Sequence, residues 1–294
     1  MQQRSIGNDV VGRVSVGAIG LGAMPLSTKE DRPSREDAVA TVHAALDAGV
    51  TLIDTADAYS WDESEFGHNE LLVAKALASY GSGADDVLVA TKGGHTRDGR
   101  EWGLDGSPSY LRQACEASLN RLGVEAIGLY QFHRPDPDTP WEESMAGLRH
   151  LYDAGLVRML GVSNADIAQI DVARSILGDA LVSVQNQFSP GWRFSADELA
   201  HCAAHGLAWL PWSPFGGISA AGSLDAAAPA FSDVADELGV SVYQVTLAWH
   251  LAQADVVVPI PGASRPASIR DSAAAADLTL TEEQLAHLNA TPPS

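Results

Sequence analysis

The sequence predicts one fold, a single (β/α)8 TIM barrel over residues 1–294 with a short N-terminal β-hairpin and C-terminal helices. Three observations support it. Short apolar runs alternate with amphipathic segments of helix length, and eight such strand-then-helix units can be counted. No linker divides them, and 294 residues suit a single barrel of this type. The alternative, an open sheet with a second domain, accommodates eight units in this length less well.

The first half of the chain supplies four of these units. Residues 4–16 alternate loosely about Asn8-Asp9, which predicts a hairpin ahead of the barrel, and the first core strand is expected at 18–22. Ser34 and Gly49 are start and stop signals for a helix ending at about residue 48. The next three strands are expected to end at Asp54, Lys92 and His133. The helices after them are expected over residues 70–79, 107–122 and 139–154, with a Gly-rich loop over 93–106.

The second half repeats the pattern. Strands are expected over residues 157–162, 181–185, 207–212 and 256–259. Helices are expected over residues 164–177, 195–205, 226–238, 241–252, 266–276 and 281–288. Ser195 and Glu198 have the spacing of a capping box at the start of the helix over 195–205. A Gly/Ser-rich loop is expected over residues 213–225.

The composition is that of a soluble globular protein and limits its partners. Apolar residues make up 46% of the chain and charged residues 19%. A formal charge of −20 argues against nucleic acid and anionic membranes, whose phosphates would be repelled. Cys115 and Cys202 give no disulfide framework, and neither a signal peptide nor an apolar run of membrane-spanning length is evident. We therefore expect a cytoplasmic protein with a small-molecule substrate; its oligomeric state has no sequence signal.

Three successive strands end in an ionisable residue, namely Asp54, Lys92 and His133, and Tyr59 follows the first of them. Active sites of (β/α)8 barrels form at the carboxyl ends of the strands, so these side chains are expected to meet there. A phenol can give up a proton, and a carboxylate can position a cation that makes the loss easier. Taken singly, each has a simpler interpretation as a turn, loop or packing residue. Their conjunction indicates a site for proton transfer.

Short motifs occur in a fixed order along nearly the whole chain. They are Asp54-Thr55-Ala56 with Tyr59, Thr91-Lys92, Gln131-Phe132-His133-Arg134-Pro135-Asp136, Gly161-Val162-Ser163-Asn164, Gln185, Ser213-Pro214 and Ile260-Pro261-Gly262-Ala263-Ser264-Arg265. In this order and spacing the sequence resembles the aldo-keto reductase superfamily. The resemblance implies NAD(P)H-dependent reduction of an aldehyde or ketone to the alcohol. It also implies a catalytic tetrad of Asp54, Tyr59, Lys92 and His133.

The implied roles agree with the chemistry of the four side chains. Tyr59 would donate a proton to the carbonyl oxygen. A free phenol, with a pKa near 10, is a poor acid at neutral pH, and Lys92, held by Asp54, is expected to lower that pKa. His133 would hydrogen-bond the carbonyl oxygen and orient it. In the oxidative direction Tyr59 would act as the base.

The dinucleotide would bind without the glycine-rich loop of a Rossmann fold. The glycines of residues 17–22 do not have Gly-x-Gly-x-x-Gly spacing, and no phosphate loop ending in Gly-Lys-Ser/Thr is present. The resemblance places the cofactor at later strand ends. It implies Ser163, Asn164 and Gln185 at the carboxamide, and Ser213, Phe215 and Gly217 at the pyrophosphate. Trp212 would stack on the nicotinamide, at a position where the family more usually has tyrosine.

The adenosine end of the cofactor is assigned by the same resemblance, to Gly262, Ser264, Arg265, Ser268 and Ser272. A helix beginning near residue 266 would also direct free N–H groups at phosphate. Arg265 is the candidate contact for a 2′-phosphate, which favours NADPH over NADH; a surface cation at a helix start is the simpler interpretation. Ser268 and Ser272 stand where many members have arginine and asparagine, which weakens the preference for NADPH.

Loop tryptophans are the candidates for the substrate pocket. Trp61, Trp102 and Trp192 fall after strands, where they would either line an apolar pocket or simply pack the loops. His201 and His205 have the i, i+4 spacing of a metal pair, but no third ligand is evident, so no metal is expected.

We therefore expect an NADPH-dependent carbonyl reductase. The runner-up is an NAD(P)+-linked dehydrogenase of a sugar or other polyol. From a different class, the family includes barrel subunits that attach to ion channels and act as redox-sensing partners. The complete tetrad favours turnover over that role.

Overall fold

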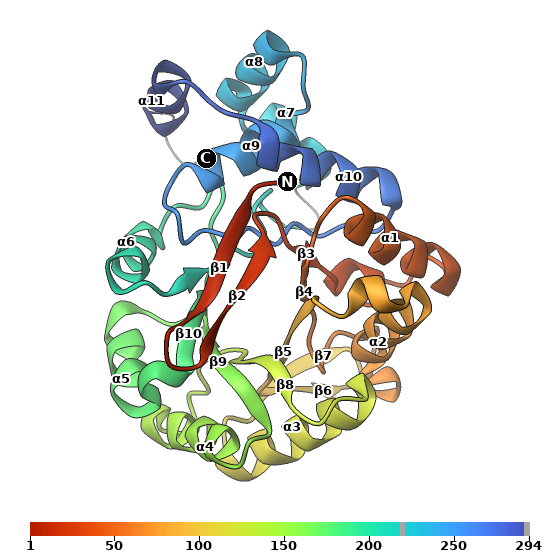
Figure 1. Ribbon diagram of the computed structural model, residues 1–294, viewed down its shortest axis with the longest axis vertical. Coiled ribbons are helices and arrows are strands. Elements are labelled where there is room, and N and C mark those ends of the chain that lie inside the picture. Colours follow the sequence, from red (N-terminus) through yellow and green to blue (C-terminus); the bar gives the residue numbers. More distant parts are fainter. Residues whose placement is uncertain (218–220, 291–294) are drawn as a thin grey trace.

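A computed structural model describes residues 1–217 and 221–290 and shows parallel strands enclosed by helices (Figure 1). Seven strands form one curled parallel sheet in the order β11-β10-β9-β8-β5-β4-β3. They are β3 (Leu21–Gly22), β4 (Leu52–Asp54), β5 (Leu88–Gly93), β8 (Ile127–Phe132), β9 (Val157–Ser163), β10 (Leu181–Gln185) and β11 (Ala208–Trp209). Neighbours in this sheet follow the chain order, as successive β/α units require.

The eighth position of the barrel is filled by residues 256–262. This segment bridges to Trp209 of β11 at one edge of the sheet and to Gly22 of β3 at the other, which closes the barrel. It forms single bridges in place of a continuous ladder, because Pro259 and Pro261 have no N–H to donate. The expected eighth strand is therefore in place without being a regular strand.

Helices cover the outside of the barrel, as Figure 1 shows. Those that follow the strands are α1 (Arg35–Asp47), α2 (His68–Tyr80), α3 (Pro108–Leu122), α4 (Trp141–Asp153), α5 (Ile167–Leu177), α6 (Ala196–His205), α9 (Val242–Leu251) and α10 (Pro266–Ala274). The additional helices are α7 (Leu224–Ala227), α8 (Pro229–Leu238) and α11 (Glu282–Ala290), which lie together beyond α9. In the two described stretches, no helix is both long and apolar enough to cross a membrane.

Side-chain caps fix several helix starts. Ser34, Ser107 and Ser241 each accept a hydrogen bond from the backbone N–H three residues on, at the starts of α1, α3 and α9. These starts agree with the sequence signals.

The cap of α6 and the start of α5 differ from expectation. The predicted capping box of Ser195 and Glu198 is wrong, because Ser195 has φ −96° and ψ 22° and its side chain makes no capping bond. An N-cap needs a more extended backbone for its oxygen to reach the next turn. Helix α5 begins later than expected, because Asp166 and Gln169 form a capping box ahead of it.

A second hairpin occupies residues 95–104, within the stretch 93–106 where a loop was expected. β6 (His95–Asp98) and β7 (Glu101–Leu104) pair antiparallel across a tight turn in which Gly99 has φ 55°. The loop prediction is wrong because Gly99-Arg100, in a stretch interpreted as loop from its glycines, forms a two-residue hairpin turn, and glycine at the first turn position favours such a turn. In the other expected loop, over 213–225, residues 218–220 lie outside the described residues.

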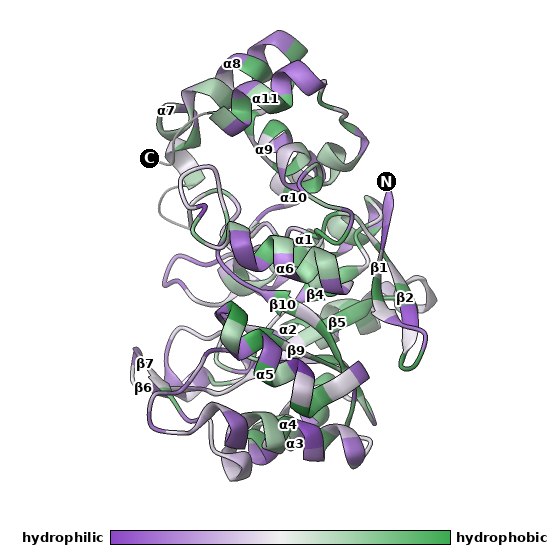
Figure 2. Ribbon diagram, turned by 90° about the vertical axis from the view of Figure 1, so that its left-hand side faces the viewer, coloured by the Kyte–Doolittle hydropathy of each residue, from purple (hydrophilic) through white to green (hydrophobic). Residues whose placement is uncertain are grey.

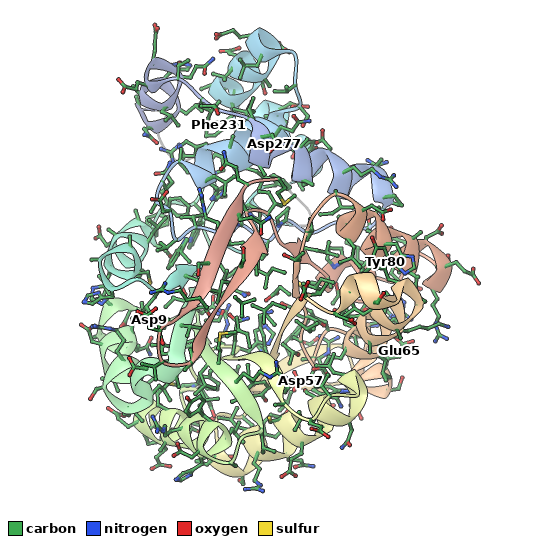
Figure 3. All side chains as sticks on the ribbon, in the orientation of Figure 1. Asp9, Asp57, Glu65, Tyr80, Phe231 and Asp277 are labelled. Carbon is green, nitrogen blue, oxygen red and sulfur yellow. The ribbon has the colours of Figure 1, made fainter. Side chains whose placement is uncertain are left out.

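The predicted N-terminal hairpin is present and closes the amino end of the barrel. β1 (Gln3–Asn8) and β2 (Gly12–Gly17) pair antiparallel and place Ile6 and Val16, both fully buried, against the barrel interior. Side chains fill that interior (Figure 3). Figure 2 shows the β1–β2 and β6–β7 hairpins on opposite sides of the molecule, so the second hairpin marks the carboxyl end.

Candidate active site

The ionisable residues of the strand ends come from three neighbouring strands. Asp54 ends β4, Lys92 lies near the end of β5, and His133 follows β8, and β4, β5 and β8 are adjacent in the sheet. Tyr59 lies in the loop after β4. All four side chains are buried, and Lys92 is completely so. The parallel sheet therefore brings the four expected catalytic residues together.

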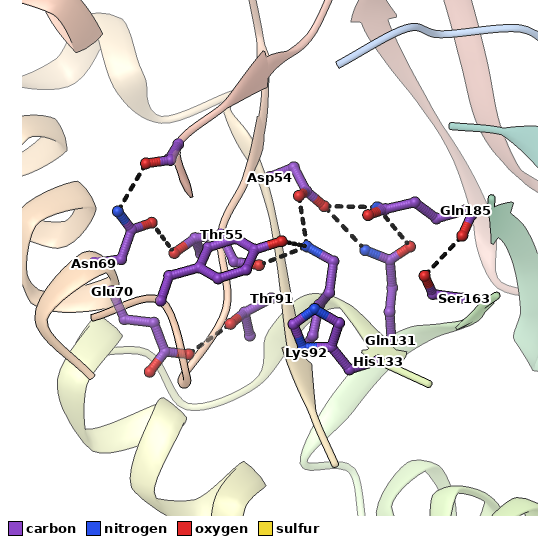
Figure 4. A network of polar contacts seen from close by, with 12 residues as sticks. Asp54, Thr55, Asn69, Glu70, Thr91, Lys92, Gln131, His133, Ser163 and Gln185 are labelled. Atoms are coloured by element: carbon purple, nitrogen blue, oxygen red, sulfur yellow. Dashed lines mark hydrogen bonds and ion pairs between the residues drawn. The ribbon is translucent and has the colours of Figure 1, made fainter. Parts of the chain in front are cut away.

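The Lys92 ammonium lies at the centre of this group. Its Nζ donates to Asp54 Oδ1 at 2.5 Å, to the Thr55 carbonyl at 2.9 Å and to the Tyr59 hydroxyl oxygen at 3.1 Å. Figure 4 shows these three bonds. An ammonium has three N–H groups, so each of them is committed. Burial alone would lower the pKa of Lys92, but Asp54 and Tyr59 outweigh it and raise the pKa above its ordinary value.

Asp54 is fixed from its other side by two amides. Its Oδ2 accepts from Gln185 Nε2 at 2.8 Å and from Gln131 Nε2 at 3.2 Å (Figure 4). Gln131 had no role in the sequence analysis. The signal for it is its place two residues before His133 on β8, because alternate residues of a strand point to the same side.

The pKa of Tyr59 differs from expectation. Burial raises it above its ordinary value by more than the neighbouring Lys92 lowers it. The predicted lowering is therefore wrong, because desolvation of a buried phenolate exceeds the attraction of one cation that already serves Asp54. The phenol keeps its proton at neutral pH. Its oxygen accepts from Lys92, which leaves its own O–H free for another acceptor.

His133 lies against the phenol ring. The ring centroids of Tyr59 and His133 are 5.5 Å apart in an edge-on arrangement. Burial, followed by the positive charge of Lys92, holds the pKa of His133 well below its ordinary value, so the imidazole is neutral. The Asn164 side-chain amide donates to the His133 carbonyl at 3.0 Å and ties this position to the end of β9.

His95 is a further residue of the site, which the sequence analysis missed. Its ring centroid lies 4.3 Å from that of His133, nearly perpendicular to it, and 5.2 Å from that of Trp102. Its Nδ1 donates to the Gly103 carbonyl at 2.9 Å. Burial lowers its pKa. The signal for His95 was Gly99 at the first position of a two-residue hairpin turn, which would have placed this side chain on a strand beside the barrel mouth.

A cleft of about 730 Å³ opens beside these residues. Asp54, Tyr59 and His133 line it, whereas Lys92 lies behind Tyr59 and Asp54. His95 and Trp102 of the β6–β7 hairpin form part of its wall. Trp61 and Trp192 are not among its lining residues; Trp61 lies under Arg100, and Trp192 contacts Phe194.

Most of the expected cofactor residues also line the cleft. From the ends of β9 and β10 come Ser163, Asn164 and Gln185; from the segment after β11 come Trp212, Ser213, Phe215 and Gly217; and from the segment before α10 come Gly262 and Ser264. Asn164 and Ser213 have φ of 59° and 51°, a left-handed conformation that is uncommon for residues other than glycine. Such strained backbone is often found at functional sites.

The remaining expected cofactor residues lie on or next to α10 and do not line the cleft. Arg265 precedes the helix, is exposed, and donates from Nε to Ser268 Oγ at 2.9 Å. Ser272 is buried in the body of α10. The structure thus places Gly262 and Ser264 in the cleft, with Arg265 next to them at its rim.

Cations gather at the cleft although the chain has a net charge of −20. Lys29, Arg32 and Arg134 line it, together with Asp31. Arg32 is paired with Glu65 in the structure. The sequence analysis did not identify these residues, because nothing in the chain order says which loop residues turn inward.

The histidine pair of α6 has other partners. His201 Nε2 bonds to Asp171 at 2.9 Å, and His205 Nδ1 bonds to the His201 carbonyl at 2.8 Å. Across the described residues, no group of three or more His, Cys, Asp or Glu side chains is arranged to hold a metal ion.

Known proteins resemble this chain over almost its full length. The model of the aldo/keto reductase family matches residues 18–291. A 6-dehydroglucose reductase of Novosphingobium aromaticivorans is 36% identical over 269 residues, which cover 89% of this chain and 87% of that protein. The structure of a glycerol dehydrogenase from Gluconobacter oxydans has a TM-score of 0.81 at 27% identity, covering 97% of this chain and 94% of that one. An aldo-keto reductase from Klebsiella pneumoniae, solved in complex with NADPH, has a TM-score of 0.79 at 27% identity, covering 100% of this chain and 97% of that one.

The barrel, the buried lysine between a carboxylate and a phenol, and the family match over residues 18–291 agree with one another. We conclude that this chain belongs to the aldo/keto reductase family of oxidoreductases.

Proposed function

We propose that this protein reduces an aldehyde or ketone to the alcohol with NADPH, and that Tyr59 donates the proton. The observation that carries the proposal is the Tyr59 hydroxyl in the wall of the cleft, 3.1 Å from the Lys92 ammonium. All three N–H groups of Lys92 are committed, so the phenol is the group with a proton to give. The reductase relative and the neighbour solved with NADPH support the same reaction.

The cleft fits a nicotinamide dinucleotide. Ser163, Asn164 and Gln185 offer hydroxyl and amide groups for a carboxamide, and Trp212 offers a flat ring whose buried indole N–H has no hydrogen-bond partner. Ser213, Phe215 and Gly217 are assigned to the pyrophosphate. Gly262, Ser264, Arg265, Ser268 and Ser272 are assigned to the adenosine end, at the N-terminus of α10, whose positive dipole end suits a phosphate. When bound, this cofactor supplies the hydride that reduces the carbonyl carbon.

The residues of the chain handle the proton. His133, neutral and edge-on to Tyr59, orients the carbonyl oxygen toward the phenol by a hydrogen bond. As the phenol gives up its proton, the Lys92 ammonium stabilises the charge that develops on the phenol oxygen. Asp54 keeps Lys92 in place, and the two glutamine amides keep Asp54 in place. In the reverse direction the same phenolate would accept the proton of an alcohol.

Replacing Tyr59 with Phe tests the proton donor directly. Tyr59→Phe is expected to lower the turnover number for aldehyde reduction by about 10²–10⁴-fold, the usual contribution of a positioned general acid. Cofactor binding, measured by quenching of tryptophan fluorescence through Trp212, should be unchanged because the ring is retained.

The matched control is Tyr80→Phe. Tyr80 ends α2, away from the cleft, and its hydroxyl donates to Asp47 at the end of α1. This variant should turn over like the wild type. Full activity in Tyr59→Phe would overturn the assigned role.

Two finer points are tested by initial rates. The cations of the cleft and Arg265 at its rim support NADPH over NADH; a higher kcat/KM with NADH would contradict this.

A polyol dehydrogenase is the second candidate, supported by the structural neighbour that is a glycerol dehydrogenase. Faster turnover of glycerol with NADP+ than of glyceraldehyde with NADPH would favour that direction. Turnover of a simple aldehyde by the isolated chain would dismiss a redox-sensing channel subunit.

A further inference from the structure

His95 has one ring nitrogen whose function the fold explains and one whose function it does not. Nδ1 donates to the Gly103 carbonyl at 2.9 Å across the β6–β7 hairpin. A carbonyl only accepts, so Nδ1 carries the proton and Nε2 of the neutral ring is an acceptor. Nε2 has no hydrogen-bond partner among the described residues. It is not fully buried either, so it is open to solvent. The hairpin thus presents a fixed hydrogen-bond acceptor.

His95 lines the cleft beside His133, which in turn lies against the proposed proton donor Tyr59. Four rings follow one another along the wall of the cleft: Tyr59, His133, His95 and Trp102. Successive centroids are 5.5, 4.3 and 5.2 Å apart, with each ring edge-on to the next. A carbonyl oxygen held by Tyr59 and His133 would therefore place the next carbon or two of the substrate beside His95.

The hairpin holds this ring firmly. The Tyr110 hydroxyl donates to the His95 carbonyl at 2.8 Å. The Arg97 guanidinium packs 4.1 Å from the Trp102 ring and donates to the Trp61 carbonyl at 2.7 Å. A fixed acceptor recognises a donor better than a mobile one does, because less entropy is lost on binding.

We propose that His95 is a specificity residue, whose Nε2 accepts a hydrogen bond from a hydroxyl group on the carbon next to the reacting carbonyl. The inference rests on the proposed carbonyl reduction and adds to it a substrate class, the α-hydroxy aldehydes and ketones. A plain alkyl aldehyde would leave this partly buried acceptor without a partner, and a site built to bond a hydroxyl discriminates against the analogue that lacks it.

The test compares three substrates that differ at one position: 2-hydroxypropanal, 2-methoxypropanal and propanal. The hydroxyl compound donates a hydrogen bond, and the methoxy compound does not. We expect the kcat/KM of the wild type to favour the hydroxyl compound over both others. The ratio of two substrates, compared between wild type and variant, cancels their intrinsic difference in reactivity.

The principal variant is His95→Asn. The amide nitrogen of asparagine reaches the position of Nδ1 and retains the bond to Gly103, but nothing replaces Nε2. We expect the hydroxyl-to-alkyl ratio of kcat/KM to fall about tenfold, the effect of one lost hydrogen bond. His95→Gln extends its amide to the position of Nε2 and should recover part of the ratio. Asp98→Ala at the exposed end of β6 is the control and should change neither rate.

The outcomes separate the inference from the function on which it rests. An unchanged ratio in a folded His95→Asn, with wild-type thermal unfolding and cofactor quenching, would overturn the role of His95 and leave carbonyl reduction standing. An equal loss on all three substrates would also overturn it, because His95 would then only support the hairpin. Absence of turnover for every aldehyde in the wild type would contradict the proposed function, and the inference with it.

Discussion

A buried lysine with three fixed acceptors governs the electrostatics of the site. Lys92 is completely buried, and its neighbours keep it charged. Desolvating an ammonium is costly unless it is paired and hydrogen-bonded, and Asp54, Thr55 and Tyr59 meet that requirement. The same arrangement that stabilises the cation leaves the Tyr59 proton as the one available for transfer.

The pKa shifts predict different pH profiles for the two directions of the reaction. Burial raises the pKa of Tyr59 above its ordinary value and lowers that of His133 well below its own. In the proposed mechanism reduction needs a protonated phenol and a neutral imidazole, so it should keep a constant kcat from about pH 6.5 to about pH 9. Alcohol oxidation needs the phenolate, so its kcat should rise about tenfold per pH unit over the same range.

Steady-state rates at saturating cofactor, measured in both directions, check this profile. A reduction rate that falls with a midpoint below about pH 9 would mean that Lys92 outweighs burial and lowers the pKa of Tyr59 below that of a free phenol.

At the scale of the elements, a buried acid joins two helices to the strand that carries Lys92. Glu70 in the first turn of α2 accepts from Arg121 of α3 at 2.5 Å and from the Thr91 hydroxyl of β5 at 2.6 Å. The Glu70 side chain is completely buried, and that of Arg121 is 18% exposed. The pair thus fixes α2 and α3 to β5 directly beside the site.

Glu70→Gln should destabilise the fold by about 3 kcal/mol, because Arg121 loses its counter-charge in a mostly buried position. This is the low end for a buried ion pair, since Arg121 keeps some contact with water. Urea unfolding followed by circular dichroism measures the change. The control is Glu116→Gln, which breaks the exposed pair with Arg112 on α3 and should leave the unfolding midpoint nearly unchanged. Equal effects of the two substitutions would contradict the role of burial.

The β6–β7 hairpin is the element whose structure differs most from the sequence prediction near the site. Interpreted as a loop, this stretch gave no position for any side chain. As a hairpin it holds His95 and Trp102 in the cleft wall. Sequence reasoning missed it because a two-residue turn at Gly99-Arg100 and a glycine-rich loop have similar composition. The register that distinguishes them is set by pairing between the two arms.

At the scale of the whole molecule, the barrel separates stability from chemistry. The β1–β2 hairpin packs Ile6 and Val16 into the amino end, and the cleft opens at the carboxyl end. Conservative changes at the first end should therefore alter stability without altering the reaction.

Ile6→Ala tests this separation. Removing most of a fully buried side chain should cost about 2–5 kcal/mol, seen as a lower thermal midpoint, with kcat and KM unchanged at temperatures where the variant stays folded. Val10→Ala in the turn of the same hairpin, where the side chain is 69% exposed, is the control and should behave as the wild type. A change in KM for Ile6→Ala would show that the two ends of the barrel are coupled.

The sequence by itself determined the barrel, most of its strands and helices, and the four side chains that meet at its mouth. It did so because apolar periodicity sets the alternation of elements, and parallel strands bring their carboxyl ends to one edge. The sign of the Tyr59 pKa shift, the hairpin with His95, and the inward turn of Lys29 and Arg134 were decided only by the tertiary structure. Burial, pairing register and loop direction depend on residues distant in the chain, which no local pattern encodes.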